Sequence, residues 1–492
     1  ILENTNFLEN TSFIRGNIQI KQTLNKYWLG IALATEDNKI INNETKIYNE
    51  RSQKFISYNA FIGVGDTTKV HTKVGFNFRN NDSIRNNEFT RTNSEKIFYL
   101  KSKLIQNKKT NLDVYANFRT VNNSFFENTN SLNSRVNYRQ KMWKNFVTSN
   151  TLYETSSGTL PQQEFTYIKT ETGQGFYTWI DYNNNGEQEF DEFEIAQFTD
   201  QANYLRVALP AINYLKINRN KFSQSLVINA QDWNTKKGFK KILSQFSNQS
   251  YLLIDSKKKR EGSSFNLNPF AIKNSAILGL EYNLKNSLFF RRGKQNYSTS
   301  YIYSKSKNTG NFGIGTQENQ ILLRELQFQH RIGKYWLVDL IGNLKNIENS
   351  SENFTERNYK IDAKGLVSKL TFSISNSTNF SLHHEYKTKE ENLGLSNVSA
   401  NSLGLAYQYS KIKKGSIIAN IDYHNNNFEG DENSPIAYQI LDGLQPGNNF
   451  VWNLLIQKKL NSYLDLNLNY SGRKSEISRT IHTGNIQVRA NF

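Results

Sequence analysis

The amino-acid sequence predicts an all-β fold: a transmembrane antiparallel β-barrel of about 20 strands, within a range of roughly 16–24, with one inserted acidic loop region. Three observations predict it. Apolar and polar residues alternate, the alternating runs are long, and a polar composition is combined with many aromatic rings. The 492-residue chain has 26 Tyr and 32 Phe, no Cys and five Pro, and its mean hydropathy is −0.67. A large β-structure with one wet face has such a composition, whereas disordered chains lack abundant aromatics.

The composition also argues against several other classes of protein. Without Cys, the chain can form neither a disulfide nor a thiolate zinc site. It contains no run of about 18 or more apolar residues, which a helical membrane protein needs. The net charge of +18 is spread along the chain without a nucleic-acid-binding motif, so no nucleic-acid partner is expected. We interpret the densest basic run, residues 257–260, as a solvated loop beside a turn.

Alternation with period two is the dominant pattern. Leu464, Leu466 and Leu468, for example, alternate with Asp465 and Asn467. Because successive side chains of a strand point to opposite faces, each such run has one apolar and one polar face. Runs of the same kind occur at residues 56–64, 70–79, 112–119, 417–423 and 450–456.

The length of these runs favours a membrane barrel. They are about 9–12 residues long, whereas a strand of a soluble protein has about five or six, and a tilted strand that spans a bilayer needs about 9–11. Aromatic residues lie towards the ends of the runs, as expected of aromatic girdles. Closure into a barrel removes the sheet edges that lipid does not tolerate. A soluble sandwich or propeller is the alternative, but no repeat of about 40 residues indicates blades.

The last run carries a further indication. Gly484, Ile486 and Val488 alternate with polar residues, and the sequence stops at Phe492. A terminal aromatic residue in register with such a strand resembles the C-terminal signal of bacterial outer-membrane barrels. We therefore expect the barrel-assembly machinery to read the strand that ends at Phe492, and outer-membrane lipid and lipopolysaccharide to surround the barrel. No signal peptide precedes the polar sequence that follows Ile1, so we expect a mature chain or a piece of a longer one.

Within the barrel expected over residues 1–492, residues 157–217 break the alternation and predict an inserted loop region. From Asp181 to Asp200 there are seven acidic residues and no Lys or Arg. The stretch from Asp181 to Glu192 matches the calcium-loop pattern D-x-[DN]-x-[DN]-G-x5-E. Such loops supply the hard oxygen ligands, about six to eight in number, that Ca²⁺ prefers. The predicted ligands are Asp181, Asn183, Asn185, Glu187, Glu189 and Glu192.

In this loop we expect Glu187 to contribute its backbone carbonyl and Glu189 to bind directly or through water. An Asn-rich turn that fits the pattern by coincidence is the alternative. Residues 176–180 are β-branched or aromatic, so they predict a strand rather than the helix of an EF-hand. The calcium ion would therefore hold an inserted loop together rather than act as a sensor. Residues 236–246 fit either a short amphipathic helix or an irregular strand.

The sequence shows no catalytic constellation, and we expect that the chain is not an enzyme. His383 and His384 are adjacent in a strand-like run, so they point to opposite faces and cannot ligate one metal ion. No H-E-x-x-H, G-x-S-x-G or P-loop motif occurs. The remaining histidines are isolated, and we interpret them as solvated barrel residues: His71, His330, His424 and His482.

Several segments together resemble a known family. They are residues 175–186, 191–194, 200–204, 441–447, 472–474 and 482–484. They resemble segments of large, mostly uncharacterised outer-membrane proteins of Bacteroidota, and the resemblance extends from about residue 160 to the C-terminus. It implies a barrel and an outer-membrane address but no substrate. Because members of that family have further material before the barrel, Ile1 is expected to be an internal start.

The sequence thus favours an outer-membrane β-barrel that provides a porin-like passage for a solute or a polypeptide. A second hypothesis is a structural or accessory barrel of a multi-protein export or assembly complex, in which the calcium-bound loop docks a partner. A third is the barrel of a TonB-dependent importer, although the start of this chain shows neither a plug nor a TonB-contact segment.

Overall fold

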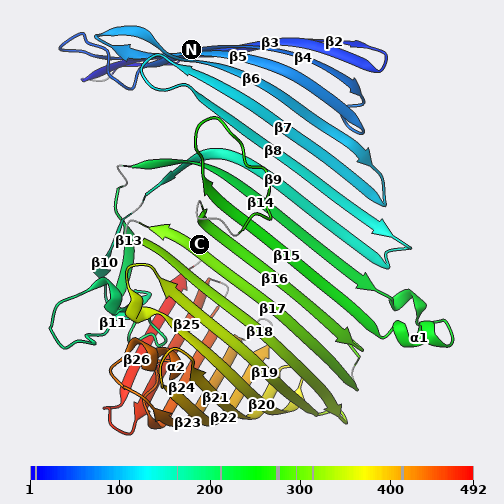
Figure 1. Cartoon of the computed structure of the whole chain (residues 1–492), viewed down its shortest axis with the longest axis vertical. Helices are drawn as coiled ribbons and strands as arrows, with labels where there is room; N and C mark the ends of the chain where they lie inside the picture. Colours follow the sequence, from blue (N-terminus) through cyan, green and yellow to red (C-terminus); the bar gives the residue numbers. More distant parts are fainter. Residues whose placement is uncertain are drawn as a thin grey trace. The chain divides into compact units, whose positions relative to one another are not determined.

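The computed structural model describes residues 2–5, 8–162, 164–210, 213–272, 277–294, 296–312, 315–411, 415–461 and 463–490 (Figure 1). Twenty-two strands of the described chain belong to one sheet and four to a smaller one. This result confirms the all-β fold class, and the strand number lies within the predicted range. None of the helices in the described part of the chain has the length and apolar character needed to cross a membrane.

The chain forms two compact units. Unit 1 comprises Ile1–Leu160, Tyr214–Leu226 and Leu252–Leu278. Its strands pair antiparallel in chain order from β1 to β9, and β9 also pairs with β14. The strands that lie wholly or mostly in unit 1 are β1 (Leu2–Thr5), β2 (Glu9–Leu24), β3 (Tyr27–Asn42), β4 (Gln53–Gly65), β5 (His71–Arg85), β6 (Glu88–Gln106), β7 (Thr110–Asn123), β8 (Thr129–Met142), β9 (Val147–Pro161), β14 (Tyr214–Asn229) and β15 (Phe246–Lys259).

Unit 2 comprises Pro161–Asn213, Val227–Tyr251 and Gly279–Phe492. Its large-sheet strands pair antiparallel in chain order from β16 to β26. They are β16 (Ile277–Phe290), β17 (Tyr297–Phe312), β18 (Gly315–Ile332), β19 (Trp336–Ser351), β20 (Tyr359–Ser375), β21 (Thr378–Glu391), β22 (Asn397–Lys411), β23 (Gly415–Glu429), β24 (Gly447–Lys459), β25 (Leu464–Ser475) and β26 (Ile481–Ala490).

The interval 157–217 contains the smaller sheet together with the end of β9 and the start of β14. We call residues 165–208 the insert. Its strands lie in the order β10-β13-β11-β12. They are β10 (Phe165–Lys169), β11 (Tyr177–Trp179), β12 (Phe193–Ile195) and β13 (Tyr204–Ala208), with the 3-10 helix η1 (Phe190–Glu192) before β12. The strand predicted for residues 176–180 is therefore present.

The few helices are short. The segment 236–246 contains the helix α1 (Phe239–Leu243), which follows the 3-10 helix η2 (Gln231–Trp233). A third 3-10 helix, η3 (Thr355–Arg357), joins β19 to β20, and the helix α2 (Pro435–Ile440) lies between β23 and β24.

Most strands of the large sheet are longer than the 9–12 residues expected, and β6 has 19. The strand β19 shows why. On its apolar face Trp336 and Leu344 are exposed hydrophobic residues, but Asn346 and Glu348 continue the same face. Hydrogen-bonded pairing thus continues past the apolar section, because the backbone ladder does not depend on side-chain polarity. The alternation in the sequence marks only the apolar section.

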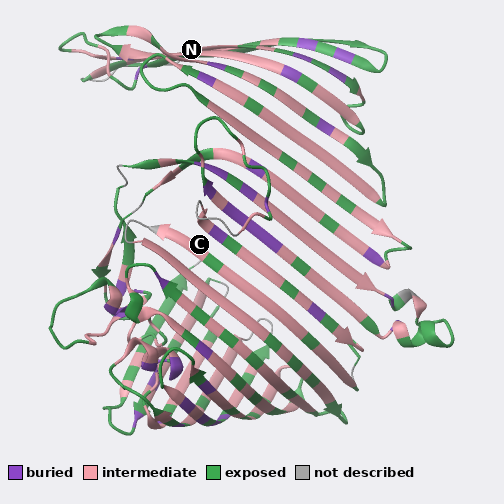
Figure 2. Cartoon of the chain, in the orientation of Figure 1, coloured by how far each residue is buried: buried purple, intermediate pink, exposed green. Residues whose placement is uncertain are grey.

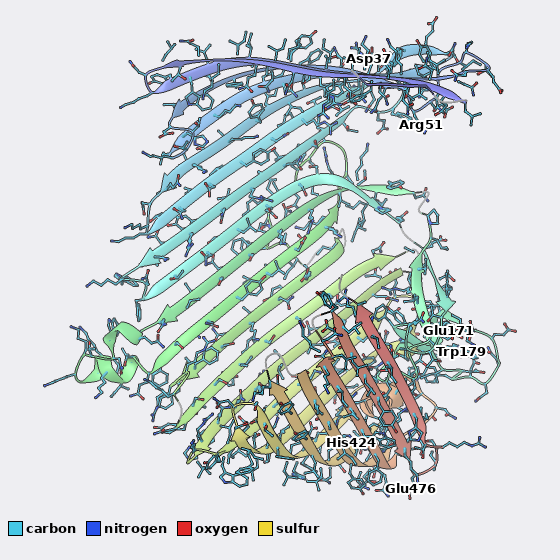
Figure 3. The ribbon with its side chains drawn as sticks, turned by 180° about the vertical axis from the view of Figure 1, so that it is seen from behind. Asp37, Arg51, Glu171, Trp179, His424 and Glu476 are labelled. Atoms are coloured by element: carbon cyan, nitrogen blue, oxygen red, sulfur yellow. The ribbon has the colours of Figure 1, made fainter. Side chains whose placement is uncertain are left out.

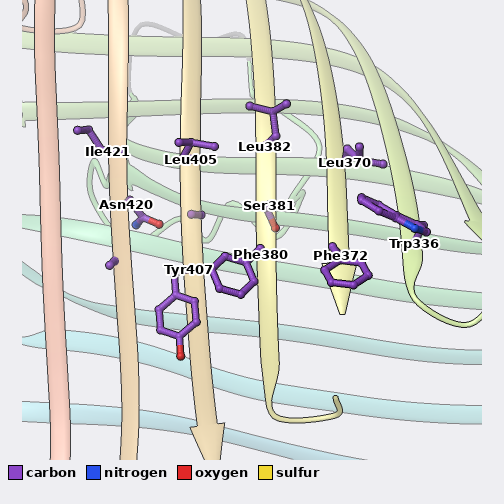
Figure 4. Close-up of a pocket in the computed structure, with 12 residues that line it drawn as sticks. Trp336, Leu370, Phe372, Phe380, Ser381, Leu382, Leu405, Tyr407, Asn420 and Ile421 are labelled. Atoms are coloured by element: carbon purple, nitrogen blue, oxygen red, sulfur yellow. The ribbon is translucent and has the colours of Figure 1, made fainter. Parts of the chain in front are cut away.

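The apolar face of unit 2 is continuous from strand to strand. Leu382 lies opposite Leu405, which in turn lies opposite Ile421, and all three side chains are exposed. Next to this aliphatic row lie the aromatic rings of Phe380 and Tyr407, with centroids 4.8 Å apart. Figure 4 shows the two rows side by side along β20 to β23. Figure 2 shows the alternation of more and less exposed residues along the strands.

The basic run at 257–260 is not a solvated loop. Lys257–Lys259 end β15, and Lys258 is buried, with its Nζ donating a hydrogen bond to the carbonyl oxygen of Asn268 at 3.0 Å. The Arg260 guanidinium donates to the carbonyl oxygen of Asn130 at 2.6 Å. The connection after β15 supplies the acceptor of Lys258 and β8 supplies that of Arg260, so burial does not leave the charges without a hydrogen bond.

Candidate functional site

The insert has a small aromatic core of its own. The rings of Tyr167 and Phe193 stack at a centroid distance of 3.9 Å, and the ring of Tyr204 meets Phe193 edge-on at 5.1 Å. Phe193 and Tyr204 are both buried. Because aromatic rings bury much area per residue, four strands of three to five residues can pack as a unit.

The first half of the predicted calcium loop forms a tight polar turn. The backbone N–H groups of Asn185 and Gly186 donate to the two carboxylate oxygens of Asp181 at 3.1 and 2.8 Å. The side-chain oxygen of Asn183 accepts from the Asn185 N–H at 2.9 Å, and that of Asn185 accepts from the Glu187 N–H at 2.7 Å. The backbone of Gly186 has a φ of +77°, which glycine adopts without strain. Residues 181–187 therefore form a turn that is held by their own Asp and Asn side chains.

The second half of the loop is arranged differently. Glu192 is buried, and its carboxylate accepts hydrogen bonds from Trp179 Nε1 at 2.8 Å and from the Tyr182 N–H at 3.2 Å. The Glu189 carboxylate accepts from the Asn183 side-chain amide at 2.6 Å. The described residues contain no group of three or more His, Asp or Glu side chains placed to hold a metal ion. Glu192 therefore closes the base of the loop as a hydrogen-bond acceptor. Figure 3 labels Trp179 in the insert.

The insert contacts the polar side of the unit 2 sheet through buried charges. Glu194 is 2% exposed, and its Oε2 lies 2.9 Å from Arg357 Nη2 at the end of η3. The same oxygen accepts from Gln439 Nε2 of α2 at 3.0 Å. Burial raises the pKa of the Glu194 carboxyl above its ordinary value, although Arg357 and Gln439 act in the opposite direction. The ion pair thus compensates only part of the cost of burying the carboxylate.

A second contact ties the insert to β25. The guanidinium of Arg473 donates to Asp200 Oδ2 at 2.7 Å through Nη2 and at 3.2 Å through Nε. Tyr438 of α2 also connects the insert to this helix. Its hydroxyl accepts a hydrogen bond from the Gln197 N–H at 3.1 Å and donates one to the Ile195 carbonyl oxygen at 3.1 Å. Burial raises the pKa of Tyr438 to about 12, so this hydroxyl keeps its proton at neutral pH.

The connection between β23 and β24 lies against the same sheet. Ala437 and Ile440 of α2 are fully buried and pack with Ile361 of β20 and Val398 of β22. The carboxylate of Asp442 lies 2.6 Å from Lys389 Nζ and 2.7 Å from Lys387 Nζ. α2 and the insert therefore share the polar face of β20 to β25. We call this face polar because the exposed apolar residues of these strands point to the opposite face, at the positions that alternate with those in contact with α2 and the insert.

A cavity of about 390 Å³ lies where the insert meets β18, β19 and α2. Its insert side is aromatic, with Phe165 and Tyr177, and Arg206 stacks on the Phe165 ring at 4.8 Å. Its sheet side is polar: it is lined by Gln317, Asn319, Asn349, Ser351, Arg357 and Gln439. Chemically, this cavity can contact an uncharged polar solute through amide groups and aromatic faces.

His424, which was interpreted as an isolated residue, has a side-chain partner, and so does His383. His424 Nδ1 lies 2.7 Å from Ser402 Oγ, and Ser402 is 3% exposed. His383 Nε2 lies 3.0 Å from Asp422 Oδ1. Because Ser402 is buried, its hydroxyl is not accessible to an external substrate. We therefore interpret the contact between Ser402 and His424 as a structural contact on the polar face of the sheet. As predicted, His383 and His384 lie on opposite faces, facing Gly404 and Leu403.

Sequence reasoning identified the acidic loop but not the residues that anchor the insert. Arg357 and Arg473 follow their acidic partners by more than 150 positions, so no local pattern could reveal either ion pair. One signal was available. Asp200 and Arg473 lie in two of the segments on which the family resemblance rests, and these segments meet in the structure. Phe492, expected to be read by the assembly machinery, lies outside the described residues.

Comparison by sequence gives no assignment. No protein-family model matches the chain, and no curated protein matches it.

Comparison of structures finds similar outer-membrane proteins at low identity. The ferric-catecholate import receptor Fiu of E. coli K12 is 10% identical, with 94% of this chain and 75% of that chain covered and a TM-score of 0.32. The FrpB iron transporter of Neisseria meningitidis is 10% identical, with 98% and 78% covered and a TM-score of 0.36. OmpT of Vibrio cholerae is 9% identical, with 91% and 98% covered and a TM-score of 0.27.

Proposed function

We propose that the chain is an outer-membrane β-barrel whose polar face lines a passage for a solute or a polypeptide. The observation that carries this proposal is the apolar face of the sheet, where exposed aliphatic residues and a row of aromatic rings run continuously across β19 to β23. A water-soluble sheet would have to cover such a face with another layer, because large exposed apolar patches are rare in soluble monomers. In a bilayer, lipid covers it.

The connections in unit 2 suggest an orientation. Residues 333–335 and 376–377 form short turns at one end of the strands, whereas residues 352–358 and 430–446 form longer connections at the other. Outer-membrane barrels have short periplasmic turns and longer extracellular loops. The insert contacts Arg357 and α2, which belong to the longer connections, and we therefore place it at the extracellular end.

Conductance in planar bilayers tests the passage. A closed barrel of 22 strands would exceed the size at which a barrel, at about 16–18 strands, already leaves an aqueous channel. Because the insert lies against the polar face, we expect small steps from the wild-type protein and larger steps from Arg473→Gln, which loses the ion pair to Asp200. Arg135→Gln, which removes an ion pair of β8 and β9, is the matched control. If none of the three proteins conducted ions, the proposed passage would be contradicted.

The second candidate function is that of an accessory barrel in an envelope complex. It is favoured by the exposed hydrophobic side chains of the insert, since Phe176 is 70% exposed and Ile195 63% exposed. Residues of this kind at the rim of a barrel suit a protein partner. Co-purification from native membranes, compared between the wild type and Phe176→Ser, would identify such a partner. Equal recovery of the same proteins with both chains would argue against docking at Phe176.

We further propose that the acidic loop binds Ca²⁺. The turn over residues 181–187 supports this proposal, because it gathers the oxygens of Asp181, Asn183 and Asn185 as in calcium loops of this pattern. Lipopolysaccharide around the apolar face and recognition of the C-terminal strand by the assembly machinery remain part of the proposal. So does a Bacteroidota origin, which rests on the resemblance of the sequence.

A further inference from the structure

A row of ammonium groups and aromatic rings crosses six strands of unit 1 on the polar face, from β2 to β7. Figure 1 shows these six strands side by side. We call it the Lys–aromatic ladder. Its members are Lys21, Trp28, Phe61, Lys73, Tyr99, Lys101 and Tyr115. The face is the polar one because the neighbouring positions of the same strands, such as Leu29 and Ile62, carry the exposed apolar side chains. The ladder belongs to unit 1, whereas the insert belongs to unit 2.

Glycines let the rings lie flat on the sheet. Gly63 is directly opposite Trp28, and Gly75 is directly opposite Tyr99. A Cβ atom added to either glycine would come within 2.2 Å of the ring opposite. Trp28 and Phe61 are accordingly buried, at 5% and 7% exposed, although they lie on the polar face. The rings form a fixed floor, and the lysine side chains lie above it.

The lysine ammonium groups are held over these rings. Lys73 Nζ lies 3.7 Å from the centroid of the Phe61 ring, and Lys21 Nζ lies 4.8 Å from the centroid of the Trp28 ring. Lys101 Nζ lies between Tyr99 and Tyr115, 5.7 and 5.9 Å from their centroids. Contacts of this kind stabilise a cation without neutralising its charge. The ladder therefore presents fixed positive charge.

No carboxylate balances this charge. Among the described residues, none of the three ammonium groups lies within 4.0 Å of an Asp or Glu oxygen. Lys73 and Lys101 are direct cross-strand partners, an arrangement in which like charges repel. Asp113 of β7, the neighbouring acid on this face, is opposite Lys103 instead. Elsewhere on the polar faces, Arg119 pairs with Glu95 and Lys389 pairs with Asp442.

We propose that the Lys–aromatic ladder binds the carboxylate or phosphate group of an anionic solute. An anion between Lys73 and Lys101 would relieve their mutual repulsion, and the aromatic floor would contact the carbon skeleton of the solute. This proposal deepens the proposed passage, on which it rests, by naming the class of solute. Reinforcement of the sheet by the aromatic rings alone would account for the rings and the glycines, but not for two unpaired lysines facing each other.

Fluorine NMR of the detergent-solubilised protein tests the binding, because Trp28 lies in the ladder. The chain carries six Trp, so the resonance of 5-fluorotryptophan at position 28 is assigned with Trp28→Phe. Inorganic phosphate and citrate are titrated separately, against chloride at equal ionic strength. We expect a saturable shift of the Trp28 signal, and a half-saturation concentration that rises by about ten-fold or more in the double variant Lys73→Gln/Lys101→Gln. Whichever of the two anions binds identifies the group that is recognised.

Two variants control for the loss of lysine. Lys73→Arg/Lys101→Arg keeps the charges and should keep the binding, whereas Lys369→Gln removes a lysine that faces Asp339 and should change nothing. If the double Gln variant fails to fold, Lys101→Gln alone is used. The proposal is overturned if phosphate and citrate act like chloride, or if the Gln variants bind as the wild type does. Because this measurement needs no membrane, an absence of conductance would count against the passage and leave the binding site intact.

Discussion

At the scale of single residues, Asp181 and Glu192 belong to one calcium pattern but have different roles in the structure. Asp181 accepts two backbone N–H groups at the mouth of the loop, whereas Glu192 accepts from Trp179 and Tyr182 at its base. We expect Asp181→Ala to abolish stabilisation of the protein by Ca²⁺ and to leave the chelator-treated protein little changed. Glu192→Gln should destabilise the chelator-treated protein too, by about 1–3 kcal/mol, because buried donors lose a charged acceptor.

Thermal unfolding with Ca²⁺ and with a chelator, combined with the metal content of the purified protein, checks this expectation. A melting temperature of the wild type that does not respond to either treatment, together with no bound metal, would refute the calcium site. The role of Glu192 at the base of the loop would still be tested by its variant.

Glu194 gives the docking of the insert a dependence on pH. The folded protein raises the pKa of this carboxyl above its ordinary value of 4.5, so the docked insert binds the proton more tightly than the undocked one. Docking should therefore become stronger as the pH falls from 7 through the raised pKa, with the gain complete below 4.5. Hydrogen exchange of β10 to β13, corrected for the intrinsic effect of pH, measures it.

Glu194→Gln provides the control for this pH dependence. Asp442, near the insert, has a pKa below its ordinary value because Lys389 and Lys387 outweigh the effect of its burial, so it opposes the trend. The Gln variant keeps Asp442 and loses only the titration of Glu194. Protection that rises equally at low pH in the variant would mean that another group is responsible.

At the scale of strands, the ladder of unit 1 depends on glycines beneath aromatic rings. Gly63→Ala would place a methyl group 2.2 Å from the Trp28 ring, whereas an added Cβ at Gly16 of β2 meets nothing within 4 Å. We expect Gly63→Ala to cost about 1–3 kcal/mol, because the ring must leave its place. Gly16→Ala should change the free energy of unfolding by no more than about 0.5 kcal/mol.

Denaturant unfolding of the refolded protein compares the two glycine variants. Equal stability of Gly63→Ala and the wild type would show that the Trp28 ring moves without cost. The ladder would then not be a fixed floor.

The helix α2 connects the insert to the sheet, and its packing can be tested in the same way. Ile440 has no exposed surface and packs against Ile361 and Val398. Ile440→Ala should cost about 2–5 kcal/mol of local stability. Since Gln439 and Tyr438 contact the insert, hydrogen exchange should increase in β10 to β13 as well as in α2. An increase confined to α2 would show that the insert does not depend on this helix.

The strands could be predicted from the sequence because alternation with period two directly reports which face a residue occupies. Their ends could not be predicted, since positions such as Asn346 and Glu348 continue the strand after its apolar face has ended. The basic run at 257–260 was misread for a related reason. Its charges suggest solvent, but Lys258 donates to the backbone carbonyl of Asn268, in the connection that follows β15 and folds back over it.

The candidate site was predictable only in part. The loop over residues 181–192 is a local motif, and its turn follows from short-range hydrogen bonds of Asp and Asn side chains. The docking of the insert depends on Arg357 and Arg473, whose positions are set by the pairing of strands far along the chain. The ladder was missed because Lys21, Trp28 and Lys73 become neighbours only when the strands pair in register.

At the scale of the whole molecule, the two faces of one sheet would meet two different solvents. The apolar face, with Leu382 and Leu405, would face lipid, and the polar face, with His383 and Glu385, would face water. The chain contains no Cys, so single cysteines can be introduced without removing native ones. That property makes each position of a strand accessible to a spin label.

The most direct test is a nitroxide scan of β21 from Phe380 to Lys387 in liposomes. Collision rates are measured with oxygen, which concentrates in lipid, and with a water-soluble nickel chelate. We predict that the two rates alternate with a period of two: oxygen dominates at the even-numbered positions and the nickel chelate at the odd-numbered ones. Ready access of the nickel chelate to both sets of positions would contradict a membrane-spanning sheet, and with it the central claim.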